Sequence, residues 1–131
     1  MIVGPLPLAD VDKVWPEIAG WMDAACKRGR GSMTAWEIYQ GCRCGSMLLF
    51  LVWLDDQIKA AVPCRIHTVP EGQALYVVAM GGREMKRWLP ELYQFEWPKS
   101  VGIKFVDWEG REGLKRIEGA KVVRQVFRKE L

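Results

Sequence analysis

Long hydrophobic runs and histidine are what this sequence has least of. No stretch reaches the length of a membrane-spanning helix, about 18 consecutive apolar residues, and the chain does not start with a basic segment followed by an apolar run. Neither a transmembrane helix nor a signal peptide is indicated, so we expect a soluble, cytoplasmic protein. His67 is the only histidine, and no cluster of His, Cys and Asp stands out as a metal site.

Closely paired cysteines are also missing. The four cysteines are Cys26, Cys42, Cys44 and Cys64, without the Cys-x2-Cys pairs that most structural zinc sites show. In a chain without a secretory signal, free thiols that are buried or half-buried are the default over a disulfide framework. We therefore expect neither a metal centre nor disulfides.

The composition is that of one globular domain. The chain has 131 residues, 50% of them hydrophobic, and we expect a single domain over residues 1–131. Its net charge of +3 is spread over mixed clusters and does not by itself favour nucleic acid, although a weakly basic site for a phosphorylated ligand stays open. Seven tryptophans indicate a core of large rings, with a few rings left at a binding or assembly surface.

Hydrophobic periodicity predicts alternating helices and strands. Apolar residues that recur at spacings of three and four indicate a helix with one buried face, whereas short apolar runs between turn residues indicate strands. In chain order we predict a strand at 2–3, helices at 11–28 and from Ser32 or Thr34 to about Gln40, strands at 47–54, 58–68 and 73–80, a helix after Gly82, a strand at 101–108 parallel to 73–80, a helical turn at 114–118 and a strand at 120–131.

Prolines and turn residues refine these elements. Pro16 is tolerable only in the first turn of its helix, and Pro63 indicates that its strand is bent or partly unpaired there. Pro90 leaves two alternatives: the helix kinks at this residue, or it begins near Lys86 with Pro90 in its first turn. The turn Asp55-Asp56 is expected to close a hairpin, so that the three central strands form an antiparallel meander.

Gly81 and Gly82 stand between an apolar strand and an amphipathic helix. Glycine lets the backbone turn where a Cβ would clash, and the free N–H groups at the start of a helix can hold a phosphate. Many strand–helix connections also turn on glycine without binding any ligand. The pair therefore predicts either a phosphate site or a plain turn, and a helix start near Lys86 would favour the plain turn.

Three short motifs accompany this order of elements. They are Val14-Trp15-Pro16, Gly81-Gly82 before the helix with Trp88, and the segment 110–113 before Gly119-Ala120. With them the chain resembles, over nearly all its length, the GNAT superfamily of acyl-CoA-dependent N-acetyltransferases, and more narrowly the small phage- and prophage-encoded proteins with a GNAT-like fold. The resemblance implies an α+β fold whose mixed sheet has an antiparallel meander, then a strand parallel to the meander's last strand, and helices on both faces.

The resemblance also implies a site for acetyl-CoA or another acyl-CoA. In the family, backbone N–H groups of a Gln/Arg-x-x-Gly-x-Gly/Ala loop hold the cofactor's pyrophosphate in a gap between two splayed strands. The equivalent residues here are Met80, Gly81, Gly82 and Arg83, with Arg111 as a further phosphate contact. No Gln or Arg precedes the glycines at the family's spacing and one glycine step is missing, which predicts weak binding or none.

The family's catalytic positions are matched less well. Many GNAT enzymes use a tyrosine to protonate the departing thiolate, and Lys115 stands at that position here. The candidates for the base that deprotonates the amine are Asp107, Glu109, Glu71 and His67. Each of them is also typical of a solvent-facing turn or strand end, so the base stays unassigned.

Two functions follow from the resemblance. One is an acyl-CoA-dependent N-acyltransferase that acts on a small-molecule or protein amine. The other is a non-catalytic GNAT-like protein, either a structural or internal protein of a phage particle or a partner-binding protein, whose exposed tryptophans serve assembly with a partner or in a homo-oligomer. Under either reading a phage protein is expected in the host cytoplasm or in the virion. The basic C-terminal quarter favours a charge-protected edge strand over a nucleic-acid site.

Overall fold

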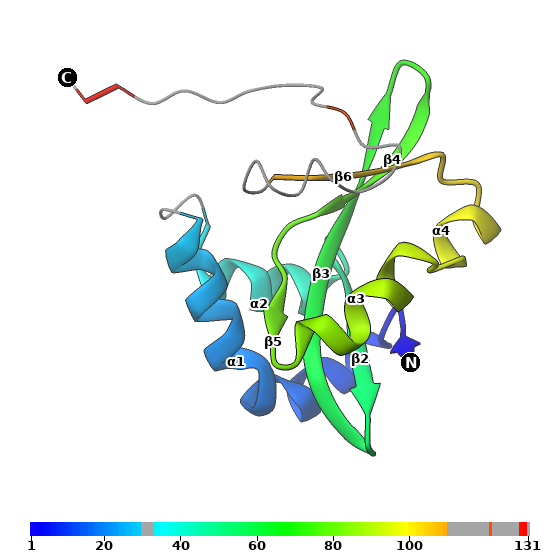
Figure 1. The fold of residues 1–131 in the computed structure, drawn as a ribbon. Coiled ribbons are helices and arrows are strands. Elements are labelled where there is room, and N and C mark those ends of the chain that lie inside the picture. Colours follow the sequence, from blue (N-terminus) through cyan, green and yellow to red (C-terminus); the bar gives the residue numbers. More distant parts are fainter. Residues whose placement is uncertain (30–32, 110–120, 122–128, 131) are drawn as a thin grey trace.

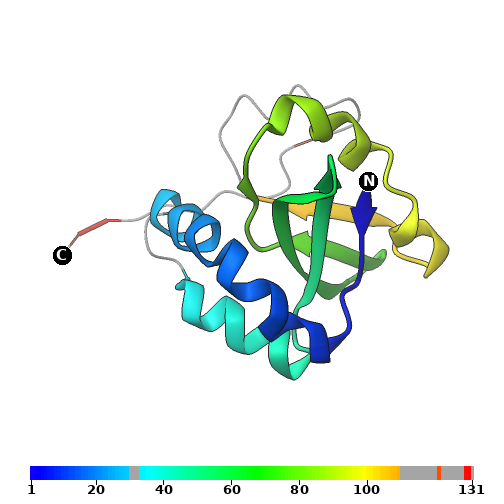
Figure 2. The ribbon, with the colours of Figure 1, turned by 90° about the horizontal axis from the view of Figure 1, so that it is seen from below.

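The computed structural model describes residues 1–29, 33–109, 121 and 129–130, and it places a mixed β-sheet between two sets of helices (Figure 1, Figure 2). Two long helices cover one face of the sheet and two short helices pack on the other. The elements are β1 (Ile2–Val3), η1 (Leu8–Asp10), α1 (Val11–Arg28), α2 (Ala35–Cys44), β2 (Leu48–Leu54), β3 (Gln57–Val69), β4 (Gly72–Val77), β5 (Gly81–Gly82), α3 (Met85–Tyr93), α4 (Trp97–Ser100) and β6 (Phe105–Trp108).

The sheet has the predicted mixed topology. Its order is β1-β2-β3-β4-β6, and all pairs are antiparallel except β4 and β6, which run parallel with Ala74 opposite Phe105. Asp55 and Asp56 close the β2–β3 hairpin with φ values of 55° and 56°, the positive values that a type I′ turn requires. The α+β class, the meander, the hairpin and the parallel last pair are therefore confirmed.

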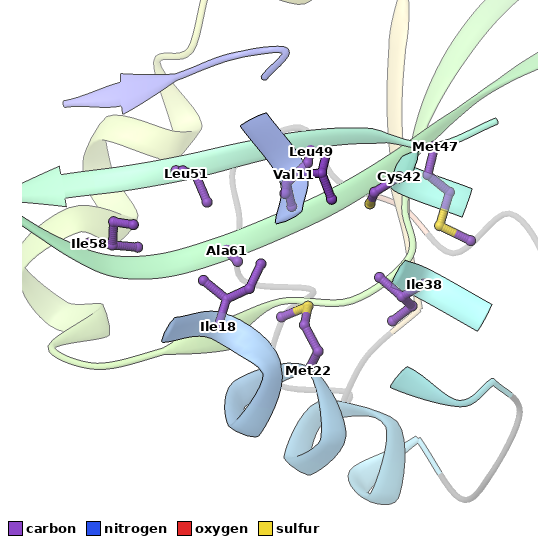
Figure 3. Close-up of a cluster of buried hydrophobic side chains, with 10 residues drawn as sticks. All are labelled: Val11, Ile18, Met22, Ile38, Cys42, Met47, Leu49, Leu51, Ile58 and Ala61. Atoms are coloured by element: carbon purple, nitrogen blue, oxygen red, sulfur yellow. The ribbon is translucent and has the colours of Figure 1, made fainter. Parts of the chain in front are cut away.

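The central strands are buried on both faces, which explains why β2 is apolar without alternation. Leu49 and Leu51 belong to the cluster under α1 and α2, whereas Phe50 and Val52 belong to the clusters on the side of α3 and α4. Figure 3 shows the first cluster, in which side chains from both long helices point at the sheet: Val11, Ile18, Met22, Ile38, Cys42, Met47, Leu49, Leu51, Ile58 and Ala61.

The helix α1 has the predicted bounds, but the expectation for its proline is wrong. Pro16 lies inside the helix, beyond the first turn. A proline there removes one hydrogen bond of the helix. The helix continues because its buried face is held in the core, where Ile18 and Met22 are 0% exposed.

The helix α2 starts as predicted and ends later. Thr34 is its cap and forms a capping box, in which the Glu37 N–H donates to Thr34 Oγ1 at 3.2 Å and the Thr34 N–H donates to Glu37 Oε1 at 3.3 Å. The helix runs to Cys44 rather than to Gln40, and it ends at Gly45, whose φ of 85° suits glycine.

Pro63 interrupts the ladder between β3 and the segment that follows β4. The Pro63 carbonyl accepts a hydrogen bond from Val78 N–H at 2.9 Å, so the N–H that proline lacks would have pointed to the same side. The regular β4 pairing stops at Cys64 opposite Val77. The strand predicted over 73–80 therefore ends early, at Val77, whereas the partial loss of pairing expected at Pro63 is confirmed.

Gly81 and Gly82 form the short strand β5 rather than a hinge. They pair with Ala61 and Ala60 of β3. A Cβ on Gly81 would lie 2.7 Å from the carbonyl oxygen of Trp21 in α1, and a Cβ on Gly82, whose φ is 157°, would overlap the backbone of β3. Both positions need glycine because backbones approach closely here, so the prediction of a plain turn at the two glycines is wrong.

The helix α3 begins at Met85, one residue before the predicted alternative start near Lys86. Pro90 nevertheless lies inside the helix rather than in its first turn, so that detail is wrong. The helix contributes Trp88, which is 0% exposed, to the cluster beside β2 and β3. Burial of this large ring compensates for the proline in a helix of nine residues.

The strand predicted at 101–108 is shorter than expected. Its first part turns back on α4, because the Ile103 N–H donates to the Pro98 carbonyl at 2.9 Å and Gly102 has φ 82°. The helical turn expected at 114–118 and the strand expected at 120–131 lie outside the described residues. No helix in the part of the chain that the structure describes is long and apolar enough to span a membrane.

Replacing Gly82 by alanine should destabilise the fold, because the new Cβ would overlap the Lys59 carbonyl oxygen and the Ala60 backbone. We expect the free energy of unfolding in urea to fall by about 2 kcal/mol or more. Gly20→Ala is the matched control: its Cβ would meet no atom within 4 Å, so alanine in this helix should stabilise by about 0.5–1 kcal/mol. Equal stabilities of the two variants would contradict the close approach.

Candidate functional site

Arg83 and Glu84 alone separate β5 from α3, where a phosphate cradle would have to lie. The Arg83 N–H donates to the Lys59 carbonyl oxygen at 2.6 Å, and the Arg83 carbonyl accepts from Trp88 Nε1 at 2.8 Å. The Arg83 guanidinium carbon lies 5.8 Å from the ring centre of Trp21. Backbone and side chain of Arg83 are thus engaged within the chain, and the turn is closed onto β3 and α1.

Glu84 places a carboxylate at the start of α3. This residue is the N-cap, with φ 58°, and its carboxylate lies 2.7 Å from Lys59 Nζ and 2.9 Å from Arg87 Nη1. Arg87 Nη1 also lies 2.8 Å from the Asp55 carboxylate. Hydrogen bonds from Lys59 and Arg87 lower the pKa of Glu84, and the hydrogen bond from Arg87 lowers the pKa of Asp55. Both carboxyls are therefore ionised at neutral pH.

Lys59 is the buried member of this network. Its side chain is 10% exposed, against 38% for Glu84 and 48% for Arg87. An ammonium that has lost most of its water needs a charged partner, which Glu84 supplies. Lys59 Nζ also donates to Gln57 Oε1 at 3.2 Å. The buried cation therefore fixes the Glu84 carboxylate at the helix start.

The charges at this turn disfavour a bound pyrophosphate. Such an anion needs unpaired N–H groups and positive charge at the start of the helix. Here the Arg83 N–H is given to β3, the charge of Lys59 is neutralised by Glu84, and Gly81 and Gly82 are paired in β5. A pyrophosphate at this place would meet the ionised carboxylate of Glu84.

The remaining residues predicted to bind the cofactor have packing contacts or lie outside the described part. Met80 packs against both clusters on the side of α3 and α4, and its carbonyl oxygen lies 3.4 Å from Arg28 Nη2, which donates to it. Arg111 is not among the described residues. The assignment of Met80, Gly81-Gly82, Arg83 and Arg111 to a cofactor stays a prediction.

Two of the predicted bases meet at one tyrosine. The His67 ring stacks on the Tyr76 ring with centres 5.1 Å apart and planes 15° apart, and Asp107 stands opposite Tyr76 in the parallel pair of β4 and β6. All three side chains are half-buried and lie on the same face of the sheet. Glu109 follows β6 and is exposed, whereas Lys115 lies outside the described residues. A catalytic role for any of these residues stays a prediction.

Sequence reasoning missed the network of Asp55, Lys59, Glu84 and Arg87. The signal that could have found it was Lys59, a cation inside the apolar first half of β3. A lysine in a strand buried on both faces requires a carboxylate partner. The sequence could not name that partner, because Glu84 reaches Lys59 only when β5 pairs with β3.

The thiols largely follow the expectation. All four cysteines are free; Cys42 and Cys64 are buried, Cys26 is half-buried, and Cys44 is exposed against expectation. Burial raises the pKa of Cys42 and of Cys64 to about 12, whereas a hydrogen bond with Ser46 lowers the pKa of Cys44. Within residues 1–29, 33–109, 121 and 129–130, no group of three or more His, Cys, Asp or Glu could hold a metal ion.

Acid should weaken the network at the start of α3. Because the folded protein lowers the pKa of Glu84 below its ordinary 4.5, its contribution to stability is full above about pH 4.5 and is lost as the pH falls through the folded pKa. We expect Glu84→Gln to unfold with a shallower pH dependence than the wild type between about pH 6 and about pH 3. Glu17→Gln, which removes an exposed carboxyl of α1, is the control. Identical pH profiles for wild type and Glu84→Gln would contradict the role of this carboxylate.

Comparison with known proteins identifies the fold of this chain and does not identify its activity. No protein-family model and no curated protein match the chain. Among solved structures, a possible acetyltransferase from Clostridium difficile 630 aligns with a TM-score of 0.64 at 12% identity, covering 100% of this chain and 97% of the other.

Two further structures agree with this match. A GNAT family acetyltransferase from Staphylococcus aureus aligns with a TM-score of 0.63 at 12% identity, and a ribosomal-protein-alanine N-acetyltransferase from Brucella melitensis with 0.63 at 9% identity. Each alignment covers 100% of this chain and 98% of the other protein's chain. None of these matches bears on a phage origin, which stays a prediction. At such identities the likeness concerns the architecture alone, and the chain has the fold of GNAT acetyltransferases.

Proposed function

We propose that this chain is a non-catalytic binding protein built on the GNAT fold. The observation that carries the proposal is the start of α3, where the Glu84 carboxylate lies 2.7 Å from the buried Lys59 ammonium. In the family that the sequence resembles, this position holds the pyrophosphate of an acyl-CoA. In this chain the Glu84 carboxylate lies at that position.

Electrostatics at this turn support the proposal. A pyrophosphate would approach an ionised carboxylate, and displacing that carboxylate would leave Lys59 buried without its partner. Removing one member of a buried ion pair leaves the other charge buried without compensation, which is unfavourable. Solvent screens part of this interaction, because the Glu84 side chain is 38% exposed. This cost would be subtracted from the binding energy of any cofactor.

The competing function is an acyl-CoA-dependent N-acyltransferase. The likeness to solved acetyltransferases over the full chain favours it, and so does the meeting of His67 and Asp107 at Tyr76. These two side chains could take a proton from an amine that lies over the sheet. The competing function nevertheless needs an acyl-CoA held nearby, so a test of cofactor binding distinguishes the two.

A place in a phage particle is the narrower form of the proposal. It derives from the sequence resemblance and from no contact described above. Detection of the protein in purified particles would support it, and absence from particles would leave a binding protein of the cell.

Acetyl-CoA at about 1 mM should leave the melting temperature unchanged. A cofactor with a dissociation constant of about 10 μM would stabilise the folded state by about 2.7 kcal/mol at that concentration, which raises the melting temperature by several degrees. Differential scanning fluorimetry measures the shift, with an active GNAT enzyme as positive control. A saturable rise that Arg83→Ala abolishes would contradict the proposal and favour the acyltransferase.

A further inference from the structure

The helices α1 and α2 lie side by side (Figure 2), and three aromatic rings from them pack against one another. The Trp15 and Tyr39 ring centres are 4.9 Å apart, and those of Trp36 and Tyr39 are 5.7 Å apart. Trp36 is 64% exposed and is the one tryptophan among the exposed large apolar side chains of the described residues. We call Trp15, Tyr39 and Trp36 the aromatic strip. A row of packed rings that ends in an exposed tryptophan is typical of the centre of a binding surface.

Charged groups at the strip show what it attracts. The guanidinium carbon of Arg43 lies 5.3 Å from the ring centre of Tyr39, so one ring already holds an arginine of the chain itself. Asp12 fixes that arrangement, because its carboxylate accepts from Tyr39 Oη at 2.5 Å and lies 3.4 Å from Arg43 Nε. The strip therefore already contains one cation–π contact, between Arg43 and Tyr39, and the charge of Arg43 is balanced by Asp12.

The end of the strip at Trp36 offers a second place of the same kind. Glu37 follows it with an exposed carboxylate, whose Oε1 takes part in the capping box. Among the described residues, no guanidinium or ammonium group lies over the Trp36 ring. Asp12 and Glu37 give two negative charges against the single positive charge of Arg43. Since Asp12 is already paired with Arg43, Glu37 is the one carboxylate of these three groups without an ion-pair partner among the described residues.

We propose that the aromatic strip binds a basic, arginine-bearing peptide segment of a partner protein, with a guanidinium stacked on Trp36 and paired with Glu37. Arginine stacks on aromatic faces and pairs with carboxylates better than lysine does, because its guanidinium is planar and weakly hydrated. Charge complementarity favours this occupant over nucleic acid, whose phosphates would find only Arg43, already paired with Asp12. The inference rests on the proposed function, since it names the partner class of that binding protein.

The test uses the full chain and a rhodamine-labelled peptide of five Arg-Gly repeats, with a peptide of five Glu-Gly repeats for comparison. We expect fluorescence anisotropy to show binding of the Arg-Gly peptide alone, weakening as salt is raised. Trp36→Ala should weaken it about 10-fold, the usual effect of truncating a central interface aromatic. Glu37→Gln should weaken it about 3-fold while keeping the capping box, because glutamine also accepts from the Thr34 N–H.

The matched control is Phe105→Ala, which truncates a ring 41% exposed on β6, away from the strip. It should bind the Arg-Gly peptide as the wild type does. Equal binding by wild type and Trp36→Ala would overturn the inference. So would self-association of the chain that Trp36→Ala abolishes, which would make a second copy the occupant, or binding of a single-stranded oligonucleotide in place of the peptide. Acetyl-CoA binding would overturn the proposed function and leave a peptide result at the strip standing.

Discussion

The contact between β5 and β3 is the one on which the rest of the structure depends. Gly82 and Gly81 pair with Ala60 and Ala61, both 0% exposed, and a Cβ on Gly82 would overlap the backbone of β3. On its other side Gly81 approaches the backbone of Trp21 in α1. Small residues at these positions allow α1, β5 and β3 to pack in direct contact. Bulkier residues would push α1 away from the sheet and open the core beneath it.

That contact also determines the chemistry at the start of α3. Because β5 runs against β3, the chain must leave it through Arg83 and Glu84, directly beside Lys59. A buried ammonium then selects a carboxylate as its neighbour. The carboxylate of Glu84 thus lies at this helix start, paired with Lys59 and Arg87. The same packing that stabilises the fold therefore sets the charge at the turn.

A shared fold does not imply a shared activity. The sheet, its parallel last pair and the helices on both faces align with acetyltransferases over the whole length. Two features of this chain carry the proposals: the ion pairs at the start of α3 and the aromatic strip on α1 and α2.

The sequence by itself determined the elements whose signals are local. The apolar spacing fixed the bounds of α1, Thr34 with Glu37 marked the start of α2, and Asp55-Asp56 marked the hairpin, because periodicity, capping and turn chemistry act over a few residues. Tertiary structure alone decided the role of Gly81-Gly82 and the pairing of Lys59 with Glu84, since both depend on segments far apart in the chain that meet only when β5 pairs with β3. A glycine needed for a turn and a glycine needed for close packing look the same in a sequence, and only the neighbouring backbone distinguishes them.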